Sequence, residues 1–112
     1  MEAKRLSKIS RLIQKELGEI LRKESRNLFH GALISVTSVR ISPDLSLAKV
    51  YLSIFSVDTS IDVIGLIKEN TKIIRYNLGV VVKNQLRIVP ELAFFNDDSL
   101  DYIENIEKLL KQ

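Results

Sequence analysis

Cysteine is absent from this sequence of 112 residues, and histidine occurs once, as His30. Disulfides, thiol chemistry, iron–sulfur clusters and zinc fingers are therefore excluded, because each needs cysteine or several histidine ligands. A Ser/His/Asp catalytic set would depend on that single imidazole, which we interpret as a loop or packing residue. No phosphate-binding loop or nucleophile–base pair is visible in the sequence. We predict no enzymatic activity, no cofactor, no metal site and no small-molecule substrate.

Long apolar segments are also absent, since no run approaches the roughly 18 residues that a membrane span needs. The chain begins with Glu2, Lys4, Arg5 and Lys8, where a secretory signal would carry an apolar core. We expect a cytoplasmic protein that does not contact membranes. Apolar residues make up 46% of the chain, and a chain of this length supports one hydrophobic core. Residues 1–112 are therefore expected to form a single domain.

The positive charge of the chain is concentrated in two segments. Residues 1–30 hold eight Lys/Arg against four Asp/Glu, and residues 68–90 hold five against one. Residues 31–67 hold two against three, and residues 91–112 are acidic, with two against six. The net charge is +3, and the asymmetry predicts an anionic partner on one side of the molecule.

A helix is predicted over residues 5–24, followed by a loop over residues 25–32, because apolar residues recur at helical spacing in the first segment. Its buried stripe consists of Leu6, Ile9, Ile13, Leu17, Ile20 and Leu21. The opposite side carries a basic row about 27 Å long, which suits several phosphates in succession. This row consists of Lys4, Lys8, Arg11, Lys15 and Arg22, with Arg5 beside it.

Two strands joined by a tight turn are predicted next. β-Branched residues favour a strand over residues 33–41, where a change of apolar face indicates a bulge or burial on both sides. The segment Ser42-Pro43-Asp44-Leu45-Ser46 has the composition of a turn. The alternation from Ala48 to Phe55 predicts a second strand whose even-numbered residues face the core. Tyr51 and Phe55 lie on its other face, where packing is favoured over stacking on nucleic-acid bases.

A long helical stretch follows and reaches about Asn84. The residues that offer N-caps for it are Asp58, Thr59 and Ser60. A straight helix of that length would span about 37 Å, so we expect a bend near Asn70-Thr71-Lys72, where residues of low helix propensity interrupt the apolar stripe. On this stretch the residues that form a second basic row are Lys68, Lys72, Arg75 and Lys83.

The last predicted elements are a strand and a short helix. The strand covers residues 86–95, and Pro90 within it requires an edge position, a bulge or a start after the proline. Apolar residues at helical spacing predict a closing helix over residues 100–110. Asp98 and Asp101 resemble a capping box at its start, which accounts for these carboxylates without catalysis.

The order helix, strand, strand, bent helix, strand, helix is typical of α+β folds with helices on one face of a small sheet. KH-type RNA-binding domains of the second topology have this order, so we predict a KH-like fold. Their Gly-x-x-Gly loop, whose backbone binds the sugar-phosphate chain, is missing, because Gly65 and Gly79 stand alone. The usual KH grip on single-stranded RNA is therefore not expected.

Four segments carry a family resemblance in the family's own order and over nearly the whole chain: ISRLIQKELGEIL, ISPDLSLAKVYLS, IIRYNLG and LRIVPELAFFNDDSLD. They resemble ribosome-binding factor A. The resemblance implies an assembly factor with a KH-like fold and no catalysis, which binds the free small (30S) ribosomal subunit and its 16S rRNA. It also implies a role in late maturation and 5′-end processing of that rRNA, especially in the cold, release before translation, and contact with other assembly factors.

The chain departs from the family at the bend, because Asn70-Thr71-Lys72 stands where members often have a small-residue Ala-x-Gly kink. Leu78-Gly79 is also farther than usual from Leu86-Arg87-Ile88. The bend and the connection after it are therefore expected to differ from those of the family.

Charge and resemblance together predict that two helical rows contact rRNA phosphates. The first is the row from Lys4 to Arg22 already described, and the second is expected to consist of Lys72, Arg75, Lys83 and Arg87. We expect a monomer, because nothing suggests a self-complementary surface. The alternative is a protein-interaction module, which would dock a partner through a sheet edge or the closing helix and whose cations would be solvated surface.

Overall fold

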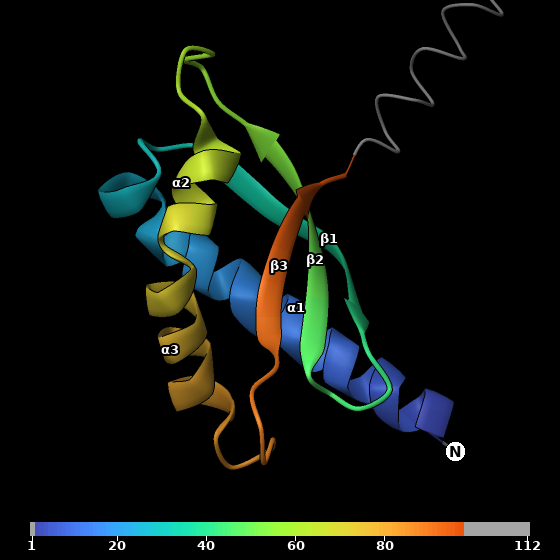
Figure 1. Cartoon of the computed structure of the whole chain (residues 1–112). Coiled ribbons are helices and arrows are strands. Elements are labelled where there is room, and N and C mark those ends of the chain that lie inside the picture. Colours follow the sequence, from blue (N-terminus) through green and yellow to red (C-terminus); the bar gives the residue numbers. More distant parts are fainter. Residues whose placement is uncertain (1, 98–112) are drawn as a thin grey trace, which may run out of the picture.

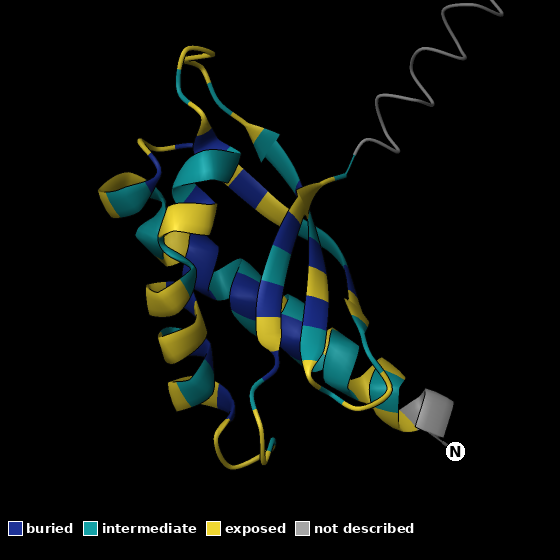
Figure 2. Ribbon diagram, in the orientation of Figure 1, coloured by how far each residue is buried: buried dark blue, intermediate teal, exposed yellow. Residues whose placement is uncertain are grey.

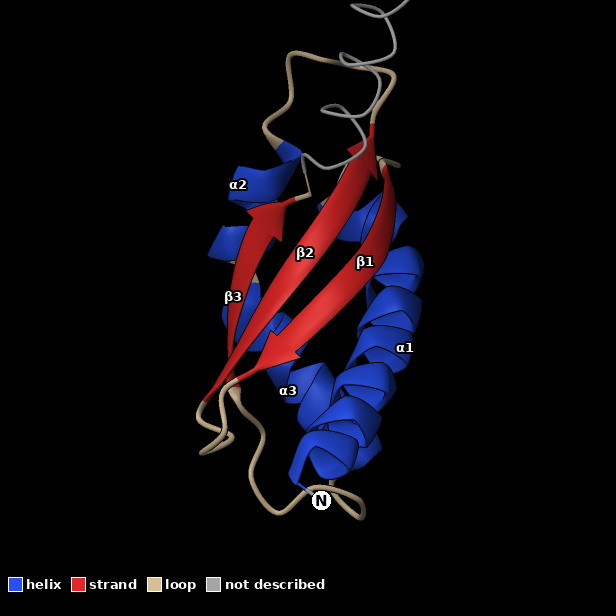
Figure 3. Cartoon of the chain, turned by 90° about the vertical axis from the view of Figure 1, so that its right-hand side faces the viewer, coloured by secondary structure: helices blue, strands red, loops and turns tan. Residues whose placement is uncertain are grey.

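The computed structural model describes residues 2–97, with side chains from Arg5 onward. Its elements in chain order are α1 (Glu2–Leu28), β1 (Leu33–Ile41), β2 (Leu47–Phe55), α2 (Val63–Glu69), α3 (Thr71–Val82) and β3 (Glu91–Asn96) (Figure 1). The strands form one sheet in the order β1-β2-β3, in which β2 runs antiparallel to β1 and parallel to β3. The described helices cover one face of this sheet (Figure 3), so the predicted α+β architecture is confirmed. The closing helix predicted over residues 100–110, with Asp98 and Asp101, lies outside the described residues.

A single hydrophobic core lies between the sheet and the helices (Figure 2). The stripe predicted for the first helix packs on β1, and α3 packs beside it. Fully buried side chains come from helices and sheet alike, and examples are Ile13, Leu17 and Leu21 of α1, Ala48 and Val50 of β2, and Ile74 and Leu78 of α3. The predicted helical and strand periodicities therefore identified the faces that form the core.

The first helix is longer than predicted, because residues 25–28 are helical and not part of the loop. Phe29 is fully buried, which holds the end of the helix against the core. The Ser25 hydroxyl donates to the Ala32 carbonyl at 2.5 Å, and the Gly31 amide donates to the Ser25 carbonyl at 3.0 Å. His30 is exposed, and with Gly31 it has a positive φ, which reverses the chain into β1. The prediction that His30 is a loop residue is confirmed.

The predicted bulge and turn both occur. The pairing of β1 with β2 shifts register between Val36 and Ser38. The residue in between, Thr37, donates through its hydroxyl to Asp97 at 2.5 Å. In the turn, Asp44 accepts hydrogen bonds from the serine side chains on either side of it. The bulge and the turn set the register that places the apolar residues of β2 in the core.

The sheet face that no described helix covers carries an aromatic contact between neighbouring strands. Tyr51 of β2 stacks on Phe95 of β3, with ring centroids 5.6 Å apart, and the Arg40 guanidinium lies 6.0 Å from the Tyr51 ring centre. Packing was predicted for Tyr51 and is confirmed. Phe55 differs, because it is exposed at the end of β2.

The long helical stretch begins later than predicted. The caps expected at residues 58–60 are wrong, because the Asp58 carboxylate instead accepts bonds from Ser60 within a turn. Asp62 is the N-cap, and its carboxylate accepts a hydrogen bond from the Gly65 amide at 3.1 Å. The stretch ends at Val82, close to the predicted limit.

The bend is at Asn70, within the predicted segment, and it separates α2 from α3. The Asn70 side-chain amide donates to the Leu66 carbonyl at 2.8 Å, and the Thr71 hydroxyl donates to the Lys68 carbonyl at 2.8 Å. The Leu66 carbonyl also accepts from the Asn70 backbone amide at 3.1 Å, so the side-chain bonds add to the backbone bonds at the end of α2. Polar side chains therefore stabilise the bend here, without a small-residue kink.

The third strand begins directly after Pro90 and lies at an edge of the sheet, so two of the three predicted arrangements are met. Residues 86–90 are a connection and not strand, so the predicted start at residue 86 is wrong. Pro90 is buried, and the Glu91 amide donates to the Ser46 carbonyl at 2.9 Å where β3 joins the sheet. The connection therefore lies beside the β1–β2 turn.

Candidate nucleic-acid interface

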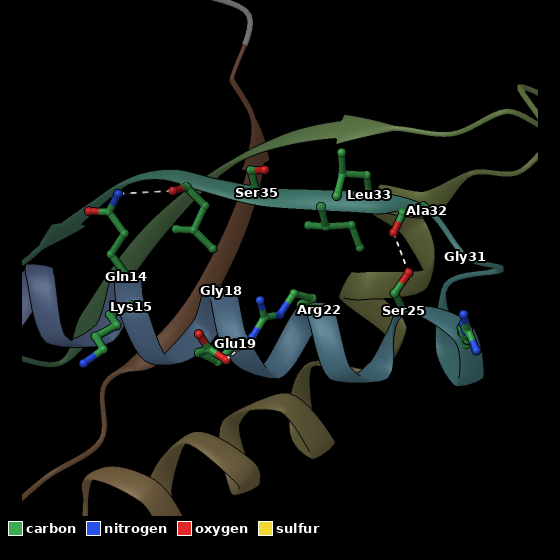
Figure 4. A pocket seen from close by; sticks show the side chains of 13 residues that line it. Gln14, Lys15, Gly18, Glu19, Arg22, Ser25, Gly31, Ala32, Leu33 and Ser35 are labelled. Carbon is green, nitrogen blue, oxygen red and sulfur yellow. Dashed lines mark hydrogen bonds and ion pairs between the residues drawn. The ribbon is translucent and has the colours of Figure 1, made fainter.

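The side of α1 opposite the core carries exposed cations. Arg11 and Lys15 lie there, and the Lys15 side chain points away from β1 (Figure 4). Arg22 lies on the same side, but its guanidinium forms an ion pair with Glu19 at 2.5 Å. This ion pair is the only one among the described residues, so the other predicted cations with described side chains are not turned onto carboxylates. The side chain of Lys4 lies outside the described part of the chain.

A groove runs between the second half of α1 and strand β1, and its volume is about 610 Å³ (Figure 4). Gln14 closes one end, where its amide donates to the Val36 carbonyl at 3.1 Å. Arg22 and Arg26 line the side formed by the helix. Arg26 was not among the predicted contacts, although its spacing of four residues from Arg22 places it next to the basic row.

The beginning of α1 meets the connection before β3 at a second hollow of about 380 Å³. Arg5 and Lys8 line it from the helix, and Arg87 lines it from the connection. Asp44 is also in its wall, where hydrogen bonds from Ser42 and Ser46 lower the pKa of Asp44 from 3.8 to about 2. This carboxylate is therefore ionised at neutral pH and offsets part of the positive charge.

Arg87 was predicted to extend the second basic row, and the structure places it elsewhere. It lies in the connection and shares a hollow with Arg5 and Lys8 of α1. The reason is that the chain leaves the axis of α3 after its C-cap Lys83, so helical spacing does not apply to Arg87. The remainder of the second row divides as well, because Lys68 belongs to α2 and precedes the bend.

The remaining cations of the second row surround a third hollow, of about 460 Å³, on α3. Lys72, Arg75 and Lys83 line it, together with Tyr76 and Gly79. All three cations are exposed. The three predicted residues therefore line the same hollow. Arg75 differs from the two lysines because its guanidinium also donates hydrogen bonds to backbone carbonyls of the connection before β3.

Tyr76 is the residue of this hollow that sequence reasoning missed. An aromatic side chain four residues after Lys72 and seven before Lys83 was the available signal, because these spacings share one side of a helix. The structure places the tyrosine between the cations, with its side chain exposed. This surface combines positive charge with an accessible aromatic ring.

The described part of the chain offers no residues for two other classes of site. Residues 2–97 contain no cluster of three or more His, Cys, Asp or Glu positioned to hold a metal ion. Over the same residues, no helix combines the length and apolar character that crossing a bilayer requires. The charged hollows on the helices are therefore the features from which a function can be argued.

Comparison with known proteins finds relatives of one family along nearly the whole chain. The model of the family described as ribosome-binding factor A matches residues 5–110. A ribosome-binding factor A from Cytophaga hutchinsonii is 45% identical over 112 residues, which cover 100% of this chain and 84% of the relative. One from Flavobacterium johnsoniae is 48% identical over 111 residues, which cover 98% of this chain and 85% of the relative.

Solved structures agree in fold. The crystal structure of ribosome-binding factor A from Thermus thermophilus superposes with a TM-score of 0.67 at 20% identity, over 81% of this chain and 94% of that one. A Thermus thermophilus homology model fitted into a cryo-EM map of a 30S complex gives 0.61 at 24% identity, over 78% and 89%. The KH-like fold predicted from the element order is therefore confirmed, and the chain belongs to the ribosome-binding factor A family.

Proposed function

We propose that this protein is an assembly factor that binds the free small ribosomal subunit through phosphates of its 16S rRNA. Membership of the family supports the proposal, as does the Thermus relative that was fitted into a map of a 30S complex. The observation that carries it is the position of the cations. They lie on exposed sides of α1 and α3, two helices that cover the same face of the sheet, and one hollow joins the start of α1 to the connection after α3.

Each phosphate contact releases condensed counterions, so the affinity for rRNA is expected to fall steeply as salt is added. The proposed contacts are Lys4, Arg5, Lys8, Arg11, Lys15, Arg22, Lys72, Arg75, Lys83 and Arg87. Arg22 and Arg75 each have a partner within the chain, and we expect them to contribute less than Lys8, Lys15, Lys72 and Lys83, which form no ion pair within the described residues. The sheet face with Tyr51 and Phe95 is on the other side of the molecule.

The bend between α2 and α3 bears on specificity. A Gly-x-x-Gly loop lets backbone approach a sugar-phosphate chain, whereas the bend here carries the side chains of Asn70 and Thr71, whose polar groups are bonded to α2. Selectivity must then come from the shape of the folded subunit, and selectivity among short RNAs of different sequence is expected to be weak.

We further propose that the protein acts in the cytoplasm, in late maturation of the small subunit and 5′-end processing of 16S rRNA. This role is expected to matter most in the cold and to end with release of the protein before translation. A strain that lacks the gene is expected to accumulate 16S precursor with an extended 5′ end and to grow poorly at low temperature. Restored processing by the wild-type gene, and not by a binding-deficient variant, would support the role. Normal precursor levels in the deletion strain would contradict it.

Binding itself is tested by density-gradient sedimentation with purified free small subunits. The wild-type chain is expected to migrate with the subunits and to dissociate as salt increases. The double variant Lys8→Glu/Lys15→Glu should bind weakly and show a shallower dependence on salt. A matched control is Arg40→Glu/Lys49→Glu, because these two exposed cations lie opposite each other on the uncovered face of the sheet.

The control variant is expected to bind like the wild type, since it changes the net charge by the same amount on the uncovered face of the sheet, which lies outside the proposed interface. Equal loss in both variants would show that only net charge matters and would contradict the proposed interface. Association that survives nuclease treatment and is indifferent to both variants would favour the protein-interaction module instead.

A further inference from the structure

An exposed tyrosine stands among the cations of α3. Tyr76 is 72% exposed, although tyrosine is on average partly buried in folded chains. It lines the hollow of about 460 Å³ with Gly79, Val80 and Val89, and no acidic residue lines that hollow. The other aromatic candidate, Tyr51, differs because its ring is already stacked on Phe95.

Gly79 lines the hollow without a side chain of its own. A Cβ atom built at Gly79 would meet the Val89 Cγ2 atom at 3.6 Å, an ordinary contact distance. The glycine is therefore not required by close packing at this point. Gly79 and Val89 form an apolar part of the lining of the hollow, which Tyr76 also lines.

Two lysines flank the ring along the axis of the helix. Lys72 lies one turn before Tyr76, and Lys83 lies two turns after it, directly past the end of α3. They are separated by about 16 Å along the axis, which leaves room for a nucleotide between two phosphate contacts. Neither lysine forms an ion pair within residues 2–97, so both are available to an anionic ligand.

We propose that this hollow binds one unpaired nucleobase of RNA, stacked on the Tyr76 ring, while Lys72 and Lys83 contact the phosphates on either side. The inference rests on the proposed function for the identity of RNA as the partner, and it adds a base-stacking subsite that the phosphate contacts do not require. An aromatic face beside cations suits single-stranded nucleic acid, because every base has a π face. A protein partner would need anionic groups to match three cations around one aromatic ring.

The test compares Tyr76→Leu, which removes the ring, with Tyr76→Phe, which keeps it. Binding to purified free small subunits is expected to fall on the order of 10-fold for Tyr76→Leu and to stay within about 2-fold of wild type for Tyr76→Phe. The same ranking is expected with a short fluorescein-labelled single-stranded RNA, and it should vanish with the corresponding duplex. Phe55→Leu is the matched control, because Phe55 is 67% exposed at the end of β2, away from the hollow.

The dependence on salt separates stacking from charge. Tyr76→Leu should leave the slope of log affinity against log salt unchanged, whereas Lys72→Gln should make it shallower by about 1. Unfolding midpoints equal to that of the wild type will show that the variants are folded.

The subsite would be wrong if Tyr76→Leu bound subunits as well as the wild type does, or if Tyr76→Leu and Phe55→Leu lost binding equally. It would also be wrong if the difference in binding between Tyr76→Leu and the wild type remained after nuclease digestion of the RNA. If Tyr76→Leu binds like the wild type while Lys8→Glu/Lys15→Glu binds weakly, the proposed function stands without the subsite. If neither variant affects subunit binding, the proposed function itself is wrong.

Discussion

Arg75 of α3 donates from Nη2 to the Val89 carbonyl at 2.7 Å, and from Nε to the Pro90 carbonyl at 3.1 Å. The two bonds fix the connection that leads into β3 to the helix that precedes it. A residue predicted from charge alone to contact RNA therefore has a structural role as well. The connection also carries Arg87, so its position affects the hollow that Arg87 shares with α1.

We expect Arg75→Met to lower the free energy of unfolding by about 1–2 kcal/mol, because it keeps an extended apolar stem and removes both donors. Arg75→Lys should recover charge but not the two bonds, since one ammonium does not reproduce the planar guanidinium. Chemical denaturation measures the loss, and sedimentation with small subunits measures binding. A stability of Arg75→Met equal to that of the wild type would show that the bonds contribute nothing in solution.

The bend between α2 and α3 provides a second prediction. Asn70→Ala removes the bond to the Leu66 carbonyl and should cost about 1 kcal/mol of unfolding free energy, in spite of the higher helix propensity of alanine. Hydrogen exchange at the Ile74 amide, which donates to the Asn70 carbonyl at 3.0 Å, is expected to become faster. Glu69→Ala is the control, because Glu69 is exposed and adjacent to the bend. Equal exchange in the two variants would contradict a role for the Asn70 side chain.

The first two strands could be predicted from the sequence, because the alternation along β2 and the β-branched run of β1 are typical of a sheet with one buried face. The end of α1 could not, since Asn27, His30 and Gly31 are local signals for a loop. Burial of Phe29 in the core outweighs the loop preference of Asn27, and the helix extends to Leu28. Propensity fails here because a tertiary contact made by the next residue decides the boundary.

The cations of the candidate site could be identified from helical spacing, but their grouping could not. Periodicity describes one helix at a time, and the approach of Arg87 to Arg5 depends on where a connection without periodicity returns to the fold. Tyr76 could in principle have been predicted from the sequence by its spacing from Lys72 and Lys83. Its exposure, which distinguishes a binding residue from a packed one, is a tertiary property.

The cap of α2 allows a test by double-mutant cycle. A Cβ at Gly65 would lie 2.3 Å from an Asp62 carboxylate oxygen, so Gly65→Ala must displace the side chain that caps the helix. In the wild-type background the gain in helix propensity, about 1 kcal/mol, should be offset by a loss of about the same size at the cap. In the Asp62→Ala background the same substitution should stabilise the protein by about 1 kcal/mol. Denaturation of the four proteins gives the coupling, and additive effects would refute the displacement.

The turn between β1 and β2 is expected to give the stability a dependence on pH in acid. Hydrogen bonds from Ser42 and Ser46 lower the pKa of Asp44 from 3.8 to about 2 in the folded chain. On acidification the unfolded chain therefore takes up this proton first. The stabilising contribution is complete above the unfolded pKa of 3.8 and is lost as pH falls toward about 2.

Asp44→Asn should flatten the part of the stability curve between about pH 4 and about pH 2, because an amide does not titrate there. Asp58→Asn should change the curve in the same direction, since bonds from Ser60 also lower the pKa of Asp58. Denaturant midpoints measured across this range in the wild type and both variants provide the comparison. If Asp44→Asn and the wild type gave the same dependence of stability on pH over the whole range, the two serines would not hold the Asp44 carboxylate in solution.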